Sequence, residues 1–344
     1  MEDRKYRQLD TFRCLGFICV LSLHWEWSGR AFADTISIGA RALDLFFVIS
    51  GFLITLILIK SKHKENNTGT SLYKFYARRF LRIFPIYYLF ILIVWLFNRG
   101  KIADSILWNL TYLSNFYSIK HQTFGGVGHL WSLAVEEQFY FVWPFMILMT
   151  NRKYLPYAII GCIFLSLGIK VYWYVNDYTY WYNMIHPLGV LDSLAIGGLL
   201  SYLYYYHQDK LRSWLFNPYI TTAIVIQALF CLSCKYIHGL EFIFHIGVRT
   251  FWGIFCFWLT GRAVFGFTGI TGRFLEFKPF VYIGKISYSM YLFHILVPGM
   301  FMGMKYPENI DLRFIFFFGV IVAIGSLSWY LVESPILRLK QRWE

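Results

Sequence analysis

Apolar stretches of about 20 residues recur along this 344-residue chain, and they constrain its fold more than any other feature. A helix of that length crosses the apolar core of a bilayer, and irregular or open structures leave backbone groups unsatisfied there. The stretches lie at residues 12–29, 40–59, 84–98, 128–149, 154–173, 185–206, 217–235, 242–261, 282–303 and 314–334. They predict an all-α, polytopic membrane protein, a bundle of about ten transmembrane helices forming one domain over residues 1–344 with no appended soluble domain.

Composition and charge support a membrane location. Hydrophobic residues make up 58% of the chain and charged residues only 15%, whereas a soluble domain has about 25% charged residues. The net charge of +13 is better explained by basic loops against an anionic inner leaflet than by nucleic acid. About two thirds of the Lys and Arg residues fall in loops on one side, which predicts that both termini are cytoplasmic. The six cysteines lie in apolar segments and predict neither disulfides nor a metal site.

The first stretch contains ionisable residues. Arg13 and His24 are 11 residues apart, within about 20° of three helical turns, so both lie on one helix face about 16 Å apart along the axis. Such groups are costly to bury in a membrane and usually face a cavity or a partner. Arg13 alone is explained by interface anchoring and His24 alone by a helix–helix hydrogen bond. Their shared face, together with Asp10, favours a functional role.

The second stretch begins near Asp44 and continues through Ser50 and Gly51. A carboxylate at the outer end of a span can orient a histidine or bind a hydroxyl group. Gly51 is expected to allow close helix packing.

A basic run, YARRFLRIFP, places Arg79 and Arg82 one helical turn apart, on a helix that Pro85 is expected to end. Such runs usually anchor a helix on the cytoplasmic side. Two guanidinium groups on one face also form a fork for phosphate oxygens. The spacing leaves both roles open.

The most unusual stretch is residues 128–140, GHLWSLAVEEQFY, in which Ser132, Glu136 and Glu137 open an otherwise apolar span beside His129. The helix dipole favours a carboxylate near a helix start. That effect explains one glutamate but not two, and we expect these residues to face a substrate.

Polar residues also open the ninth stretch and close the tenth. Tyr291 and His294 belong to the run ISYSMYLFH, and Glu333 belongs to VESP. They can line a cavity or be satisfied within the bundle, and the sequence does not distinguish the two.

Together these motifs resemble the acyltransferase-3 family of integral membrane acyltransferases, which includes bacterial O-acetyltransferases of surface polysaccharides. The resemblance extends over essentially the whole chain, through LDTFR with His24 ten residues further on, DLFFVISGFLIT, RRFLRIFP, HLWSLAVEEQFYFVWP, LDSLAIGG, ISYSMYLFH and VESP. It implies a ten-helix enzyme of the bacterial plasma membrane, with no permanently bound cofactor. Such an enzyme takes an acyl group, commonly acetyl, from cytoplasmic acyl-CoA and passes it to a hydroxyl of a surface polysaccharide or lipid-linked glycan.

The family's arginine–histidine element falls on Arg13 and His24, and its R-x-x-R element on Arg79 and Arg82. We expect the three arginines to hold the anionic head of acyl-CoA, and the pantetheine arm to reach His24. The remaining polar candidates are assigned to substrate binding: Asp10, Ser132, Glu136, Glu137, Tyr291 and His294.

Neutral His24 would accept the proton of the attacking hydroxyl. Asp44 or Glu333 would fix its tautomer and stabilise the imidazolium. A transient acyl-histidine or acyl-serine is the mechanistic alternative.

Two other classes of protein remain open. A carrier that exports a glycan or lipid-linked intermediate also needs many spans and buried charges. A purely structural membrane subunit would tolerate loss of the polar residues within its spans, and their number makes this class the weakest.

Overall fold

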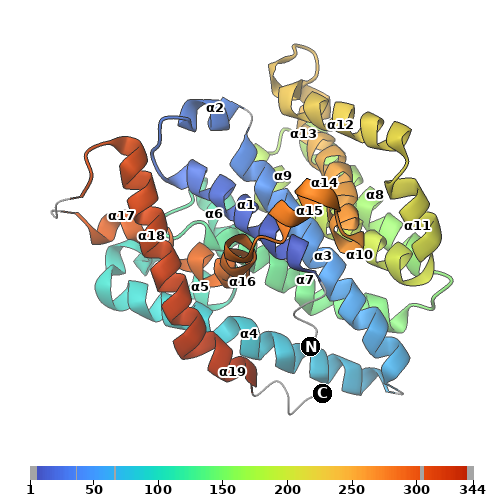
Figure 1. The fold of residues 1–344 in the computed structure, drawn as a ribbon, viewed down its shortest axis with the longest axis horizontal. Helices are drawn as coiled ribbons and strands as arrows, with labels where there is room; N and C mark the ends of the chain where they lie inside the picture. The colour runs from blue at the N-terminus through green and yellow to red at the C-terminus, as the bar shows by residue number, and fades with distance from the viewer. Residues whose placement is uncertain (1–5, 36, 66, 303–305, 339–344) are drawn as a thin grey trace. The chain divides into compact units, whose positions relative to one another are not determined.

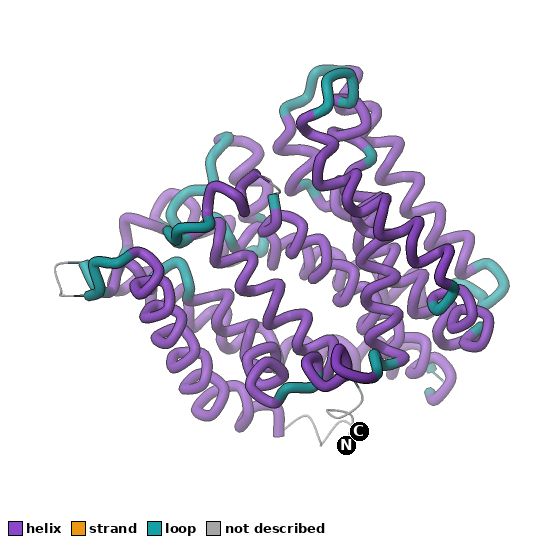
Figure 2. Tube along the Cα trace, turned by 45° about the horizontal axis from the view of Figure 1, so that its top comes forward, coloured by secondary structure: helices purple, strands orange, loops and turns teal. Residues whose placement is uncertain are grey.

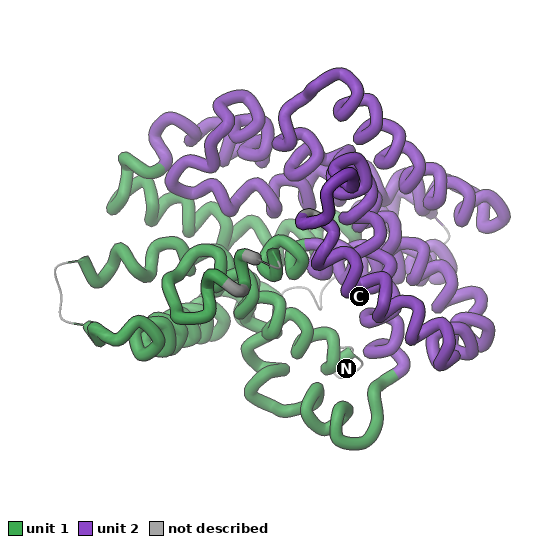
Figure 3. The backbone as a smooth tube through the Cα atoms, turned by 90° about the horizontal axis from the view of Figure 1, so that it is seen from above, with its two compact units in different colours: residues 1–43, 74–101, 266–344 green, residues 44–73, 102–265 purple. Residues whose placement is uncertain are grey.

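The computed structural model describes residues 6–35, 37–65, 67–302 and 306–338, and every regular element within these ranges is helical. Figure 2 shows these helices joined mostly by short loops, in agreement with the predicted all-α class. The chain divides into two compact units (Figure 3). Unit 1 comprises residues 1–43, 74–101 and 266–344, and unit 2 comprises residues 44–73 and 102–265.

Unit 1 is built around α1, which packs along α16, while α16 in turn packs against α18 (Figure 1). Its helices are α1 (Arg7–His24), α2 (Arg30–Thr35), η2 (Arg99–Lys101), α15 (Gly269–Leu275), α16 (Lys278–Phe293), α17 (Val297–Met300), α18 (Ile310–Ser328) and α19 (Ser334–Arg338). A π-helical turn, Trp329–Glu333, separates α18 from α19.

Unit 2 is built around α10, which packs against α8 and α14, while α14 also packs against α12. Its helices are η3 (Ala103–Ser105), α5 (Ile106–Leu110), α6 (Ser114–His121), α7 (Leu130–Met149), α8 (Leu155–Val175), α9 (Tyr180–Ile185), α10 (Pro187–Tyr206), α11 (Gln208–Leu215), α12 (Pro218–Ser233), η4 (Cys234–Tyr236), α13 (Glu241–Ile246) and α14 (Val248–Phe265). Proline at the first helical position, preceded by a capping side chain, starts both α10 and α12.

Two long helices, α3 (Ile38–Lys64) and α4 (Thr68–Phe97), contribute residues to both units. The expectation that Pro85 ends a helix is wrong, since α4 continues for twelve residues beyond it. Apolar flanking residues and packed neighbours let helices of this type tolerate proline. Asn67 accepts from the Gly69 amide at 2.7 Å directly before α4 begins at Thr68.

Each of the ten predicted apolar stretches contains a helix, but ten spans are not confirmed. Among the described residues, five helices are long and apolar enough to cross a membrane: Ile38–Lys64, Thr68–Phe97, Leu155–Val175, Tyr180–Tyr206 and Ile310–Arg338. Two pairs of consecutive helices, each bent at a short break, raise the number of candidate spans to at most seven if each pair counts as one span. α1 and α7 are long enough but contain the charged residues of the predicted site, which lower their hydropathy.

Glycines allow the closest helix contacts in each unit. In unit 2 a Cβ atom on Gly51 would lie 2.0 Å from the Leu194 carbonyl oxygen, and one on Gly197 would lie 2.1 Å from that of Val48. The predicted packing role of Gly51 is therefore confirmed. In unit 1 a Cβ atom on Gly284 would lie 1.8 Å from the Asp10 carbonyl oxygen, so α16 and α1 meet backbone to backbone.

Replacing Gly284 by alanine is expected to force α1 away from α16. Overpacking of this kind costs about 1–3 kcal/mol, and the variant should unfold at lower temperature in detergent than the wild type. Gly319→Ala is the matched control on α18, because no atom lies within 4 Å of the added methyl group. Alanine there favours the helix by about 0.5–1 kcal/mol, so equal unfolding temperatures for the two variants would contradict this account.

Candidate functional site

The first half of α1 holds an ion pair. The Arg13 guanidinium donates to the Asp10 carboxylate at 2.6 Å, and both side chains are about one-fifth exposed, at 20% and 21%. Asp10 therefore neutralises and orients Arg13. A guanidinium has five N–H groups, so Arg13 keeps donors for an anion.

The start of α1 is fixed by hydrogen bonds within unit 1. The Gln8 amide both donates to the Phe267 carbonyl at 3.1 Å and accepts from the Phe267 amide at 2.8 Å. The Thr11 hydroxyl donates to the Leu275 carbonyl at 2.6 Å. These contacts set the position of Arg13.

His24 is the last residue of α1, and its side chain is exposed. Its ring lies 4.9 Å from the ring of His294, measured between centroids, and the rings are inclined by 59°. His294 follows α16 directly and is fully buried. Since one helix contains both Arg13 and His24, the expected axial separation of about 16 Å holds.

Glu333 lies in the π-helical turn and is buried. Its Oε1 atom accepts from the Ser328 hydroxyl at 3.1 Å and from the Ser289 hydroxyl in a short contact. Its carboxylate also interacts electrostatically with Arg82. Ser289, the partner of Glu333 on α16, lies five residues before His294, which is about 7.5 Å along the helix axis. The ring that contacts His24 is that of His294. π-Turns within helices often occur at functional sites.

Arg79 and Arg82 lie on α4, within the part of the helix that belongs to unit 1. Arg82 is exposed and Arg79 is half-buried, with its guanidinium 5.9 Å from the centroid of the Phe75 ring. Their spacing of one turn and their accessibility suit an anionic ligand.

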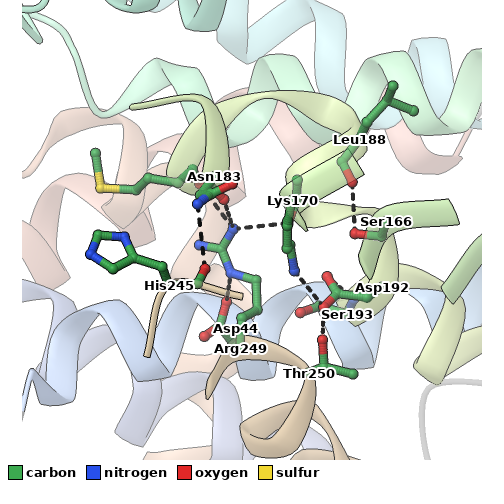
Figure 4. A network of polar contacts seen from close by, with 12 residues as sticks. Asp44, Ser166, Lys170, Asn183, Leu188, Asp192, Ser193, His245, Arg249 and Thr250 are labelled. Atoms are coloured by element: carbon green, nitrogen blue, oxygen red, sulfur yellow. Dashed lines mark hydrogen bonds and ion pairs between the residues drawn. The ribbon is translucent and has the colours of Figure 1, made fainter. Parts of the chain in front are cut away.

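Asp44 belongs to a buried polar network in unit 2 (Figure 4). The Arg249 Nε atom donates to the Asp44 carboxylate at 2.8 Å. The same guanidinium donates to the carbonyls of Asn183, Met184 and Gly189 at 2.8, 3.1 and 3.3 Å. Arg249 thereby joins α3 and α14 to the break between α9 and α10. Asp44 is the counter-ion of the Arg249 guanidinium.

A second ion pair lies in the same network. Lys170 on α8 is 1% exposed, and its ammonium group donates to Asp192 on α10 at 2.7 Å. The Thr250 hydroxyl donates to the same carboxylate oxygen in a short contact, and the Ser193 amide donates to the other oxygen at 2.9 Å. The Asp192 carboxylate thus has partners on both of its oxygens, as a charge in an apolar interior requires.

The GHLWSLAVEEQFY stretch forms the first half of α7 in unit 2. Glu136 accepts from the Ser50 hydroxyl at 3.0 Å and from the Tyr140 hydroxyl at 3.1 Å. Ser132 is buried and donates to the His129 carbonyl at 3.2 Å. Glu137, next to Glu136, is half-buried.

The structure therefore divides the predicted residues between two constellations. Unit 1 contains Asp10, Arg13, His24, Arg79, Arg82, Tyr291, His294 and Glu333; unit 2 contains Asp44, Ser132, Glu136 and Glu137. The sequence reasoning assigned no site role to Lys170 or Arg249, which form the two buried ion pairs of unit 2 with Asp192 and Asp44. A lysine inside the apolar run IFLSLGIKVYWYV, residues 163–175, was itself the available signal.

The described helices, of which five to seven are long and apolar enough to span a bilayer, fit a multi-pass membrane protein with paired ionisable groups among its helices. Residues 6–333 match the family described as an acyltransferase domain. The chain belongs to this acyltransferase-3 family, as its motifs indicated.

Two curated relatives are similar over nearly the whole chain. One is the peptidoglycan O-acetyltransferase OatA of Listeria monocytogenes, 28% identical over 97% of this chain and 56% of the relative. The other is the O-acetyltransferase OatA of Staphylococcus aureus, 24% identical over 95% of this chain and 56% of the relative. The chain thus spans about half the length of these proteins. No solved structure matches it.

Neutralising one member of the Lys170–Asp192 pair is expected to cost more than neutralising both. Lys170→Met leaves a buried carboxylate without its counter-ion, at about 3–5 kcal/mol, whereas Lys170→Met combined with Asp192→Asn removes both charges. Thermal unfolding in detergent should show a large loss for the single variant and substantial recovery for the double variant.

The matched control for this pair is Arg30→Met. Arg30 and Asp34 are 3.6 Å apart and 41% and 50% exposed, and such a pair contributes about 0–1 kcal/mol. Additive destabilisation by Lys170→Met and Asp192→Asn would show that the two charges are not energetically coupled.

Proposed function

We propose that the chain is a membrane O-acetyltransferase that moves an acetyl group from cytoplasmic acetyl-CoA to a hydroxyl of a cell-envelope carbohydrate, with peptidoglycan the first acceptor to test. The family and the names of its relatives support the reaction class. The observation that carries the proposal is α1 itself. One helix presents an arginine near its start and an exposed histidine at its end.

The donor has two parts that match these two groups. The head of CoA is anionic and fits guanidinium groups, which bind phosphate oxygens in a bidentate manner. Arg13, Arg79 and Arg82 supply such groups within unit 1. The pantetheine arm is narrow and uncharged, so it can enter an apolar bundle and bring the thioester towards His24.

At His24 the acetyl group is proposed to pass from the sulfur of CoA to the oxygen of the acceptor hydroxyl. A neutral imidazole accepts the proton of the acceptor hydroxyl as its oxygen attacks the thioester carbonyl. The acyl C–S bond breaks as the C–O bond forms, and the histidine returns the proton to the departing thiolate. The products are the acetyl ester and free CoA thiol, so atoms and charge balance without a metal.

The proposal is tested with the purified protein in liposomes, supplied with acetyl-CoA and soluble peptidoglycan fragments. We expect release of CoA thiol that depends on the acceptor, and acetyl ester on the fragments. Movement of a lipid-linked glycan across the liposome membrane without CoA release would identify a carrier instead.

Replacing His24 by alanine is expected to lower kcat by at least about 100-fold, because it removes the general base. The folded state is checked by thermal unfolding and by acetyl-CoA binding, both of which should be unchanged. Undiminished transfer by a correctly folded His24→Ala protein would remove His24 from the mechanism.

Replacing Arg79 by alanine is expected to raise the KM for acetyl-CoA by about 10- to 100-fold, the value of one charge-assisted contact, with a smaller effect on acceptor KM. Arg99→Ala is the matched control. Arg99 is exposed just beyond the other end of α4, with its guanidinium 4.4 Å from the centroid of the Trp95 ring. Equal losses for donor and acceptor would indicate a topological role for Arg79.

A further inference from the structure

The ends of α1 and α16 meet through a pair of histidines. In unit 1 these helices run in the same direction, because Asp10 lies against Gly284 near their starts and His24 lies against His294 at their ends. The Trp25 indole N–H donates to the His294 carbonyl at 3.2 Å and joins the two ends. Both rings are therefore held at fixed points of a rigid helix pair.

The hydrogen bond of His294 assigns its tautomer. Its Nδ1 atom lies 2.6 Å from the Tyr291 carbonyl oxygen. A carbonyl oxygen only accepts, so Nδ1 carries the proton, and the neutral ring has its lone pair on Nε2. Phe17, at 6.0 Å edge-to-face, and Tyr291, at 5.4 Å, pack against the same ring. These contacts hold the His294 ring in one orientation.

The two histidines differ in access. His24 is exposed, whereas His294 has no exposed surface. A substrate can therefore reach His24, and His294 can act only through His24.

We propose that His294 is the positioning residue of the acyl transfer: its buried, hydrogen-bonded ring packs against the His24 imidazole and fixes the orientation in which that imidazole meets the hydroxyl. This inference rests on the proposed function of His24. The ring centroids are 4.9 Å apart, within the range in which packed aromatic rings orient one another.

The carboxylates of unit 1 described above have other partners. Glu333 accepts from Ser289 and Ser328, and Asp10 binds Arg13. The group in contact with the His24 ring is the ring of His294, rather than either of these carboxylates.

Two substitutions at His294 test the contribution of its ring and the contribution of its hydrogen bond separately. His294→Phe keeps an aromatic ring of similar size but loses the bond to Tyr291. His294→Asn can keep an N–H donor for the Tyr291 carbonyl but loses the ring. We expect His294→Asn to lower kcat by about 10- to 100-fold, and His294→Phe to retain more of the wild-type kcat. The KM for acetyl-CoA should stay unchanged in both, because the donor head binds arginines far along the helix.

The opposite order would overturn the proposal. If His294 only fastens the end of α16, His294→Asn keeps the wild-type kcat and His294→Phe loses folded protein, measured by thermal unfolding. His186→Asn is the control for general sensitivity to loss of a packed histidine ring. That ring lies 5.0 Å from Trp173 in unit 2, and its Nδ1 accepts from the Leu188 amide at 3.2 Å. An equal fall of kcat in His186→Asn would also overturn the proposal.

Failure of this inference is distinguishable from failure of the proposed function. Wild-type protein that releases no CoA thiol, or His24→Ala protein that turns over normally, disproves the proposed function itself. Normal turnover that depends on His24 but not on the ring of His294 disproves only the inference.

Discussion

Charges inside an apolar helix bundle must be paired, and this requirement organises both units of the protein. Arg249 binds Asp44 and three backbone carbonyls, and Lys170 binds Asp192, so the interior of unit 2 contains two compensated pairs. The first pair joins helices 205 residues apart in sequence, and the second joins α8 to α10. Since an uncompensated charge there costs several kcal/mol, these pairs restrict which helix arrangements the chain can adopt. Asp44 is best understood as a member of this framework.

The sequence predicted the helices and their most unusual residues well, because both depend on local composition. Each apolar stretch became a helix because its length and hydropathy leave no other way to satisfy the backbone. Arg13 and His24 share one helix because their spacing does not depend on the rest of the fold. Gly51 was correctly assigned to packing because a missing side chain beside an apolar face is useful mainly for close approach.

The ion-pair and hydrogen-bond partners of the polar side chains were harder to predict, because they depend on which helices pack together. Nothing near Lys170 in sequence identifies Asp192, which is 22 residues away on another helix, and Arg249 is 205 residues from Asp44. The acid expected to act with His24 stays a prediction, since Glu333 binds two serines and the ring beside His24 belongs to His294. The course of α4 through Pro85 was missed because local rules for proline describe water-exposed helices better than helices packed among apolar neighbours.

The geometry of unit 1 also bears on the choice between an enzyme and a carrier. Carriers alternate access largely by rocking one helix bundle as a rigid body against another around a fixed site. In unit 1, α1 and α16 meet backbone to backbone at Gly284 and ring to ring at His294, and Trp25 bonds the two ends together. Sliding by even one turn would break all three contacts. Such a pair moves as one body, so a carrier would have to alternate access by moving other helices, whereas the proposed transfer needs only that Arg13 and His24 keep a constant separation.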